Sequence, residues 1–204
     1  MKKDVCQKLR EKIVYAYYKP GEPLNEMRLS KEFGISRTPI REALIRLSEE
    51  NLVTIVPNLG ARVADLNIYD FYHLIELRLI LERAVARLAV QKARENHIND
   101  MSKLFERVKN VKEDDIYGYV DCDREFHQII AEAAGNPILD KHLSVIRNQF
   151  IRIETVFEDT SNSVYKDLPQ AIRLLKRKDT NGLEKLMVKH VERFVARVGK
   201  KIKF

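Results

Sequence analysis

The placement of proline and glycine constrains the fold of this chain more than any other feature. Up to about residue 65, the positions that interrupt regular structure are Pro20, Gly21, Gly34, Pro57 and Gly60. After residue 69 the only prolines are Pro137 and Pro169, and apolar residues recur at helical spacing almost continuously. The first part therefore predicts a small domain of short elements, and the second predicts a bundle of long helices. We expect two domains, at residues 1–65 and 69–204.

Three short helices are predicted in the first domain. Apolar residues recur at every fourth position from Val5 to Tyr17, which predicts an amphipathic helix over residues 4–17. A second helix is expected to end at Gly34, because glycine readily adopts the left-handed conformation that closes helices. Ser36 is well placed to cap the start of a third helix. The inward face of that third helix is predicted to consist of Ile40, Ala43, Leu44 and Leu47.

A hairpin is predicted after the third helix. The β-branched stretches at residues 52–56 and 61–63 flank a turn at residues 57–60. A short helix, a tight glycine turn, a second helix and a hairpin together form the winged helix-turn-helix pattern. In that pattern the start of the second helix reaches the base edges in the major groove of DNA.

The residue types at the start of the third helix suit this chemistry. They are Ser36, Arg37, Thr38 and Arg41. Arginine can donate two hydrogen bonds to guanine O6 and N7, whereas hydroxyls and a helix N-terminus suit phosphates. Residues 28–46 also contain five basic residues against two acidic ones. The alternative is a plain three-helix domain with a solvated basic face.

Residues 29–47, LSKEFGISRTPIREALIRL, resemble the N-terminal domain of GntR-family bacterial transcription regulators. The resemblance implies that Arg37 and Arg41 contact bases. It also implies that the hydroxyls of Ser36 and Thr38 hold phosphates.

The predicted hairpin departs from the family in one respect. The resemblance implies that the turn at Gly60 enters the minor groove. The family often has a basic residue just before that glycine, whereas this chain has Leu59. Asn58 and Arg62 are the candidates to replace that contact.

The second domain resembles the FCD ligand-binding domain of the FadR-type branch. The motifs that carry this resemblance are Glu76-Leu77-Arg78 with Leu81-Glu82, Asp123-Arg124-Glu125-Phe126-His127, Gly135-Asn136-Pro137, and Asp179 with His190. The resemblance implies a mainly α protein, with an all-α, FCD-like bundle behind the winged domain. One face of its first helix is predicted to hold Leu74, Leu77, Leu81, Val85 and Leu88, which are three or four residues apart. In the family, a D-x3-H pair and two later histidines line a cavity and often bind a divalent metal, which helps hold a small carboxylate effector.

The residues also make chemical sense as a metal site. Asp123 and His127 are four residues apart, so both project from one helix face. His190 on the last helix is the natural third ligand, and such a set suits zinc, nickel or manganese. The pattern expects the fourth ligand at Leu168, which cannot bind a metal. Asp167 is adjacent, but it points about 100° away on a helix, unless Pro169 reshapes the helix start.

Each of these residues also has a simpler interpretation. An Asp–His pair one turn apart is commonly a surface ion pair or a buried, hydrogen-bonded histidine. Arg78 is a candidate to bind an effector carboxylate with two hydrogen bonds. Equally, Arg78 and Glu82 are four residues apart and can form an ordinary ion pair.

Composition excludes several classes of protein. The seven glycines are never closer than 13 positions apart, so neither a dinucleotide-binding turn nor a P-loop can form. The G-x-S-x-G, H-E-x-x-H and C-x-x-C motifs are also absent. Two cysteines, Cys6 and Cys122, are too few for a disulfide framework, which indicates a reducing compartment. No apolar run is long enough for a membrane span, so we expect a cytoplasmic protein.

The sequence therefore predicts a homodimeric transcription regulator and not an enzyme. A formal charge of +7 agrees with an operator DNA partner but does not establish one. Repression relieved by a small carboxylate metabolite is the commoner arrangement in the families that the chain resembles. One alternative is a metal-dependent enzyme that uses Asp123, His127 and His190. Another is a DNA-binding dimer without a functional sensor site, an alternative that Leu168 keeps open.

Overall fold

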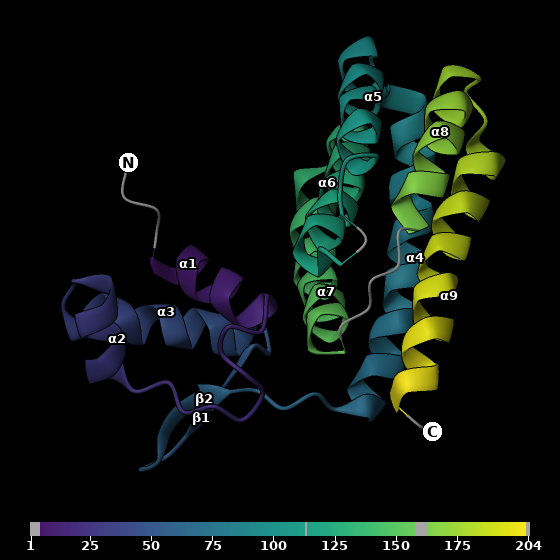
Figure 1. Ribbon diagram of the computed structural model, residues 1–204. Coiled ribbons are helices and arrows are strands. Elements are labelled where there is room, and N and C mark those ends of the chain that lie inside the picture. Colours follow the sequence, from purple (N-terminus) through teal and green to yellow (C-terminus); the bar gives the residue numbers. More distant parts are fainter. Residues whose placement is uncertain (1–4, 113, 158–162, 203–204) are drawn as a thin grey trace.

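The computed structural model describes residues 5–112, 114–157 and 163–202 of the chain. The protein is mainly α-helical, as predicted, and Figure 1 shows a lobe of short elements beside an upright bundle of long helices. The lobe contains α1 (Val5–Val14), α2 (Glu26–Phe33), α3 (Arg37–Glu49), β1 (Val53–Val56) and β2 (Gly60–Val63). The bundle contains α4 (Ile68–Lys92), α5 (Glu95–Val108), α6 (Ile116–Ala134), α7 (Pro137–Val156), α8 (Ser163–Lys176) and α9 (Thr180–Ile202).

The helix-turn-helix consists of α2, a tight turn and α3. The side chain of Asn25 caps α2 by accepting hydrogen bonds from the backbone N–H groups of Met27 and Arg28, at 2.9 and 3.0 Å. Gly34 ends α2 in the left-handed conformation, with φ of 65°. Ser36 occupies the N-cap position of α3, as predicted, but its hydroxyl makes no capping hydrogen bond. The sequence therefore predicted the N-cap residue of α3 correctly, but Ser36 does not make the side-chain hydrogen bond that usually accompanies this position.

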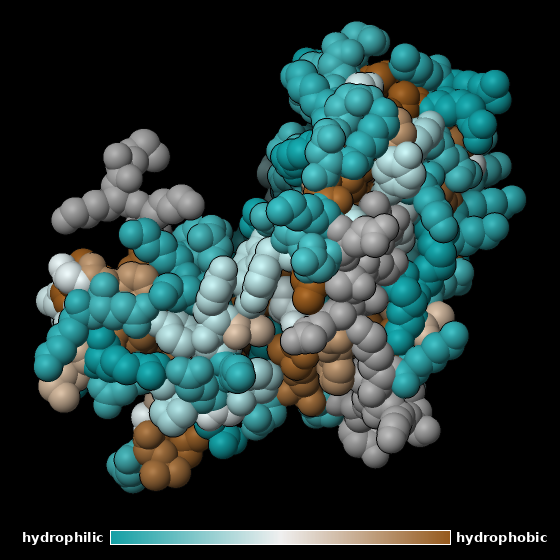
Figure 2. All heavy atoms as spheres, viewed as in Figure 1, coloured by the Kyte–Doolittle hydropathy of each residue, from teal (hydrophilic) through white to brown (hydrophobic). Residues whose placement is uncertain are grey.

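The hairpin forms the predicted wing. β1 and β2 are antiparallel, with Val53 opposite Val63. Asn58 and Gly60 both have positive φ, at 64° and 89°, which reverses the chain within a few residues. Leu59 lies between them at the tip and is 84% exposed. The apolar tip projects at the lower left of Figure 2.

The first helix is shorter than its periodicity predicts. The expected range was residues 4–17, of which the first lies outside the described part of the chain, but α1 ends at Val14. Ala16 adopts a left-handed conformation that turns the chain. Consequently Tyr18 enters the core, while Tyr17 is exposed. The four-residue spacing therefore identified the buried face of the helix up to Ile13, but not at Tyr17, which follows the end of α1.

Three consecutive residues, Gly135, Asn136 and Pro137, define the junction between α6 and α7. α6 ends at Gly135 in the left-handed conformation, and Asn136 then caps α7 by accepting from the backbone N–H of Leu139. Pro137 is the first residue of α7, where a missing N–H costs nothing. α4 packs against α6, α7 and α9, while α5 packs against α6 and α8. Within the described ranges, none of the helices combines the length with the apolar character that a membrane span requires.

The predicted apolar face of α4 is wrong at one position. Val85 is buried and its three neighbours on that face are at least half-buried, but Leu77 is 45% exposed. α4 contacts partners on more than one side, so its buried surface also includes Ala86 and Ala89. Leu77 and the 65% exposed Ile80 remain outside the core.

The two lobes share part of a hydrophobic core. Val120 of α6 and Ile151 of α7 belong to the same buried cluster as the apolar residues of α1, α3 and the hairpin. The Thr155 hydroxyl of α7 also donates a 2.9 Å hydrogen bond to the Val14 carbonyl at the end of α1. The lower parts of α6 and α7 therefore support the helix-turn-helix lobe directly.

Candidate nucleic-acid interface and candidate metal centre

The predicted DNA-contacting residues of α3 form one exposed surface. Ser36, Arg37, Thr38 and Arg41 are all exposed at the start of this helix. The Arg37 and Arg41 side chains are 63% and 61% accessible. Arg37 and Arg41 can therefore reach a ligand outside the protein without a rearrangement of the core. Their contacts with bases, and those of the two hydroxyls with phosphates, remain predictions.

A groove separates this surface from the wing. Its volume is about 370 Å³, and its lining includes Glu26, Met27, Arg37, Arg41, Leu59 and Gly60. Asn58 is exposed beside it on the wing, whereas Arg62 lies 3.7 Å from the carboxylate of Asp65. Of the two candidates to replace the missing basic residue, Asn58 is thus at the tip and Arg62 is engaged at the base of the hairpin.

Glu26 is a residue of this surface that the sequence analysis missed. Its Oε1 accepts from Arg41 Nε at 2.8 Å, and its Oε2 accepts from Arg41 Nη2 at 2.9 Å and from Arg37 Nη2 at 3.2 Å. The hydrogen bond from Arg41 is the main reason that the pKa of Glu26 lies below its ordinary value. No local motif marks Glu26, because its partners are 11 and 15 residues away on another helix.

The three predicted metal ligands lie together inside the bundle. Asp123 and His127 come from α6, and His190 comes from α9. Asp123 Oδ1 is 2.9 Å from His190 Nε2, and Asp123 Oδ2 is 3.6 Å from His127 Nε2. One ligand atom from each residue can be chosen so that all lie within 4.8 Å of one another. The two histidines are buried and the aspartate is nearly so.

Each imidazole has a carboxylate at its other nitrogen. Asp167 Oδ2 is 2.7 Å from His190 Nδ1. Glu82 Oε1 is 3.1 Å from His127 Nδ1, close enough for a charge interaction although not aligned for a hydrogen bond. Carboxylates in this position orient metal-binding imidazoles and raise their basicity. The donor set and its outer partners therefore fit a divalent cation, which would be held by Asp123, His127 and His190.

Asp167 does not replace Leu168 as a ligand, but it has another place at the site. Leu168 packs in the hydrophobic core, as its type requires, and Asp167 is buried too. The rotation of about 100° between neighbouring helical residues turns Asp167 toward α9, where it contacts His190 and Arg193. Asp167 is therefore part of the site, but as the partner of a ligand rather than in place of Leu168.

A buried pair of arginines adjoins the histidines. Arg147 donates to both carboxylate oxygens of Glu82 at 3.2 Å, and Arg78 Nε lies 3.4 Å from Glu82 Oε1. Arg78 Nη2 also lies 2.9 Å from His127 Nε2, and its guanidinium stacks over the Phe150 ring at 4.2 Å. The Arg78–Glu82 ion pair exists, and it belongs to a larger network that includes a histidine.

Arg147 is another functional candidate that the sequence analysis missed. It is buried on α7, four residues after Leu143 and three before Phe150, both of which are core residues. A basic residue on an otherwise apolar helix face was the available signal.

Burial and charge move the two histidines in opposite directions. Burial lowers the pKa of His127 to about 4, although Glu82 and Asp123 oppose the shift. Burial acts in the same direction on His190, but there the charges of Asp123 and Asp167 prevail and raise the pKa to about 9. The pKa of Asp123 lies well below its ordinary range, because the two histidines outweigh its burial. The cluster thus has a strong preference for an ionised aspartate.

The cavity at this cluster is narrow and mostly cationic. It contains only about 20 Å³ of free space. Its charged lining consists of Arg78, Arg124, Arg147, Arg197, Asp123 and Glu154, with both histidines. Such a lining suits an anion more than a cation alone, and the free space is smaller than an organic acid requires.

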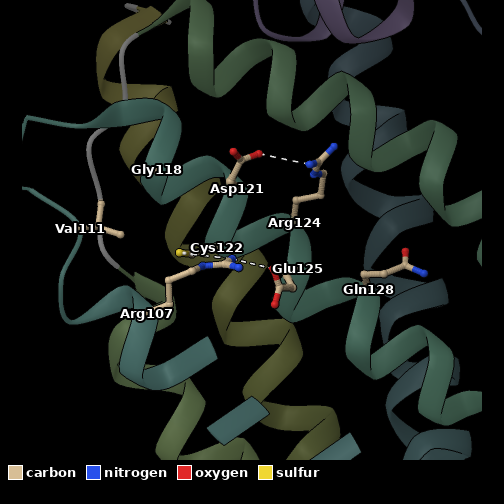
Figure 3. A pocket seen from close by; sticks show the side chains of 8 residues that line it. All are labelled: Arg107, Val111, Gly118, Asp121, Cys122, Arg124, Glu125 and Gln128. Atoms are coloured by element: carbon tan, nitrogen blue, oxygen red, sulfur yellow. Dashed lines mark hydrogen bonds and ion pairs between the residues drawn. The ribbon is translucent and has the colours of Figure 1, made fainter. Parts of the chain in front are cut away.

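Among the described residues, those that line a larger hollow on α5 and α6 do not form a comparable site. Figure 3 shows this cavity of about 660 Å³, in which the charged side chains face one another. Arg107 lies 2.6 Å from Glu125, and Arg124 lies 3.3 Å from Asp121. Burial raises the pKa of the Cys122 thiol, which disfavours its reactive form. Size alone therefore does not identify the functional cavity.

Comparison with known proteins matches each lobe to a described protein family. The family profile described as "Bacterial regulatory proteins, gntR family" matches residues 1–63, and the profile of the FCD domain matches residues 73–193. The chain is 44% identical over 82 residues to the Nta operon transcriptional regulator of Aminobacter aminovorans, covering 39% of this chain and 38% of the relative. It is 38% identical over 87 residues to the HTH-type transcriptional repressor RspR of Escherichia coli strain K12, covering 43% of this chain and 38% of the relative. Each match thus spans well under half of these curated relatives.

A solved structure has a similar fold over nearly the whole chain. E. coli McbR/YncC superimposes with a TM-score of 0.86 at 21% sequence identity, and the alignment covers 98% of this chain and 97% of that one. The similarity extends through both lobes and concerns the fold alone.

Proposed function

Because the chain belongs to the gntR family of bacterial regulatory proteins and carries a FadR-type FCD domain, we propose that it is a homodimeric repressor controlled by a small carboxylate. Membership of this family makes the protein a transcription regulator rather than an enzyme. In this proposal residues 1–65 bind a palindromic operator, and residues 69–204 dimerise and bind the effector. The protein would act in the cytoplasm, where its operator DNA lies.

The proposed DNA interface is the start of α3 together with the wing. The observation that carries it is the exposure of Arg37 and Arg41 beside a groove bordered by the wing tip. The two arginines would contact bases, and Ser36 and Thr38 would contact phosphates. Asn58 and Gly60 would reach the adjacent minor groove.

The proposed effector site is the cationic cavity of the bundle, which would have to widen beyond its free space of about 20 Å³ to admit an organic acid. A divalent metal held by Asp123, His127 and His190 would supply a Lewis-acidic centre for a carboxylate. Arg78 Nη2 lies 2.9 Å from His127 Nε2, so metal binding at that nitrogen would displace the guanidinium, which would then contribute a second cationic contact to the effector. The carboxylates that face both imidazoles support this proposal, because they occupy the places of the outer partners that metal-binding histidines usually have.

The proposed dimer interface includes the outer face of α4. Leu77 and Ile80, three residues apart on one face of α4, are exposed there. Together they would form part of an apolar patch, and an extended patch of this kind marks an interaction surface. A two-fold axis would bring the same surface of a second copy against them, in keeping with a palindromic operator.

Coupling between the two lobes would run along α7. Arg147 belongs to the buried network at the cavity, while Gln149 and Thr155 reach the other lobe. Gln149 Nε2 donates to the Glu50 carbonyl at 3.0 Å, at the end of α3. A small shift of α7 on effector binding would therefore move the recognition helix.

Selection of bound DNA from genomic fragments tests the regulator proposal. The purified protein should enrich one palindromic sequence, and enrichment of none would contradict the proposal. Genes next to the enriched sites would also indicate the class of effector.

Metal analysis tests the sensor and its alternative. Leu168 at the expected fourth ligand position is the observation that favours a DNA-binding dimer without a sensor. We expect purified wild type to hold about one divalent ion per chain and His190→Ala to hold much less. Equal metal content in the two proteins would remove the assigned site, and the DNA selection would still stand.

A further inference from the structure

We propose that Glu26 is a specificity-determining residue that fixes the Arg41 guanidinium for a contact with guanine. The inference rests on the proposed DNA-binding function, and it concerns how the surface discriminates between sequences. Glu26 would not itself contact DNA. It would act by positioning Arg41 and, to a lesser degree, Arg37.

The geometry of the contact leaves the correct edge of Arg41 available. Glu26 receives two hydrogen bonds from Arg41, from Nε at 2.8 Å and from Nη2 at 2.9 Å. These donors form the side edge of the planar guanidinium. The end edge still has one N–H on Nη1 and one on Nη2 that point away from the carboxylate. Two parallel donors of this kind match guanine O6 and N7.

The surroundings of Glu26 explain how it can hold this position. It lies in the first turn of α2, whose start is fixed by the Asn25 cap and suits a negative charge. Its side chain is largely covered, while the Arg41 side chain is mostly exposed. The carboxylate therefore belongs to the scaffold, and the guanidinium projects from it into the groove.

A direct contact between Glu26 and a cytosine is disfavoured by the same distances. Both carboxylate oxygens are engaged by Arg41, and Oε2 is also 3.2 Å from Arg37. A cytosine N4 donor would have to compete with these charged donors. Glu26 is therefore placed to orient donors rather than to accept from a base.

The negative charge of Glu26 should affect operator binding and non-specific DNA binding in opposite directions. One carboxylate beside two guanidinium groups reduces the positive charge that the surface presents to phosphates. Its removal should strengthen binding to unrelated DNA, because more positive charge raises the sequence-independent term. The same change should weaken binding to the operator, because Arg41 loses its fixed orientation. A role in folding alone would lower both affinities together.

The test compares Glu26→Gln and Glu26→Asp with the wild type in the full-length protein. Dissociation constants are measured for the selected operator, for operators with each guanine replaced in turn, and for unrelated DNA. Arg41→Ala identifies the guanine that Arg41 contacts. Replacement of that guanine lowers the affinity of the wild type but not the affinity of Arg41→Ala. We expect Glu26→Gln to lower the ratio of specific to non-specific affinity about tenfold, with the loss concentrated at this guanine. Glu26→Asp keeps the charge but is one methylene shorter, so it should lose discrimination without gaining affinity for unrelated DNA.

Glu22→Gln is the matched control. Glu22 pairs with Arg28 at 3.1 Å in the same lobe, away from the arginines of α3. Its removal should leave the ratio within about twofold of the wild-type value, because it changes the charge but not the Arg41 contact. If Glu26→Gln keeps the wild-type ratio, or loses it at a cytosine instead, the inference is wrong. If the wild type itself binds all DNA sequences equally, the proposed function is wrong, independently of the role of Glu26.

Discussion

Arginine–carboxylate pairs occur in both lobes, but they occur in opposite environments. At the start of α3 the pairs of Glu26 with Arg37 and Arg41 lie at the surface. In the bundle, Glu82 is fully buried and is surrounded by Arg78, Arg147 and His127. Exposed ion pairs contribute about 0–1 kcal/mol to stability, whereas breaking a buried pair costs about 3–5 kcal/mol.

This contrast separates two uses of one kind of contact. The surface pairs add little to stability, so their arginines remain available to an external polyanion. The buried pairs hold the bundle around its cavity, so any ligand that enters must compete with them. The two kinds of pair suit the two roles proposed for the lobes. Exposed arginines can contact DNA without breaking the core, whereas buried pairs keep the effector cavity closed when no ligand is bound.

The largest effect that tests this contrast is expected from Glu82→Ala. The variant leaves Arg147 and Arg78 without the carboxylate that neutralises them in the core. We expect the free energy of unfolding to fall by about 3–5 kcal/mol, measured by urea denaturation. The matched control is Glu184→Ala, which breaks a surface pair with the exposed Arg87 and should cost at most about 1 kcal/mol. Similar losses in the two variants would mean that the buried network is not special.

Arg41→Ala should show the reverse behaviour at the other site. If Arg41 contacts a base as proposed, its loss should weaken operator binding by about 1–3 kcal/mol and relax the preference at one base position. Stability should change little, because the side chain is exposed. Fluorescence anisotropy with the selected operator measures the first effect, and urea denaturation measures the second. The control is Arg46→Ala, later on the same helix, which should not relax a base preference. Unchanged specificity in Arg41→Ala would mean that Arg41 does not contact a base.

How well the sequence predicted a feature depends, in both lobes, on how far apart in the chain the contacting residues are. The order of helices and the wing followed from local signals, such as the glycine that ends α2 and the turn residues between β1 and β2. The grouping of Asp123, His127 and His190 followed from the resemblance to the FCD domain, and the one-turn spacing of Asp123 and His127 agrees with it. The helices, the wing and this spacing depend on residues near one another in the chain.

Features that depend on distant contacts were missed. Arg147 meets Glu82 across 65 positions, and Asp167 meets His190 across 23. Helical periodicity says which residues share a face, but not which neighbouring helix that face meets. Leu77 illustrates the same limit, because its spacing matches the core while its side chain lies outside it.

The smallest expected effect concerns the wing, where this chain has Leu59 instead of a basic residue. Leu59 is at the exposed tip beside the groove, so a longer cationic side chain there would reach the DNA backbone. Each phosphate contact changes the slope of log affinity against log salt concentration by about 0.9. Leu59→Lys should therefore steepen the slope by about one, with little change in sequence preference. Leu59→Ala, which adds no charge, should keep the wild-type slope, and an unchanged slope in Leu59→Lys would mean that the wing does not approach DNA. The wing would then contribute to the fold of the lobe rather than to its interface, and the exposed contacts would be confined to α3.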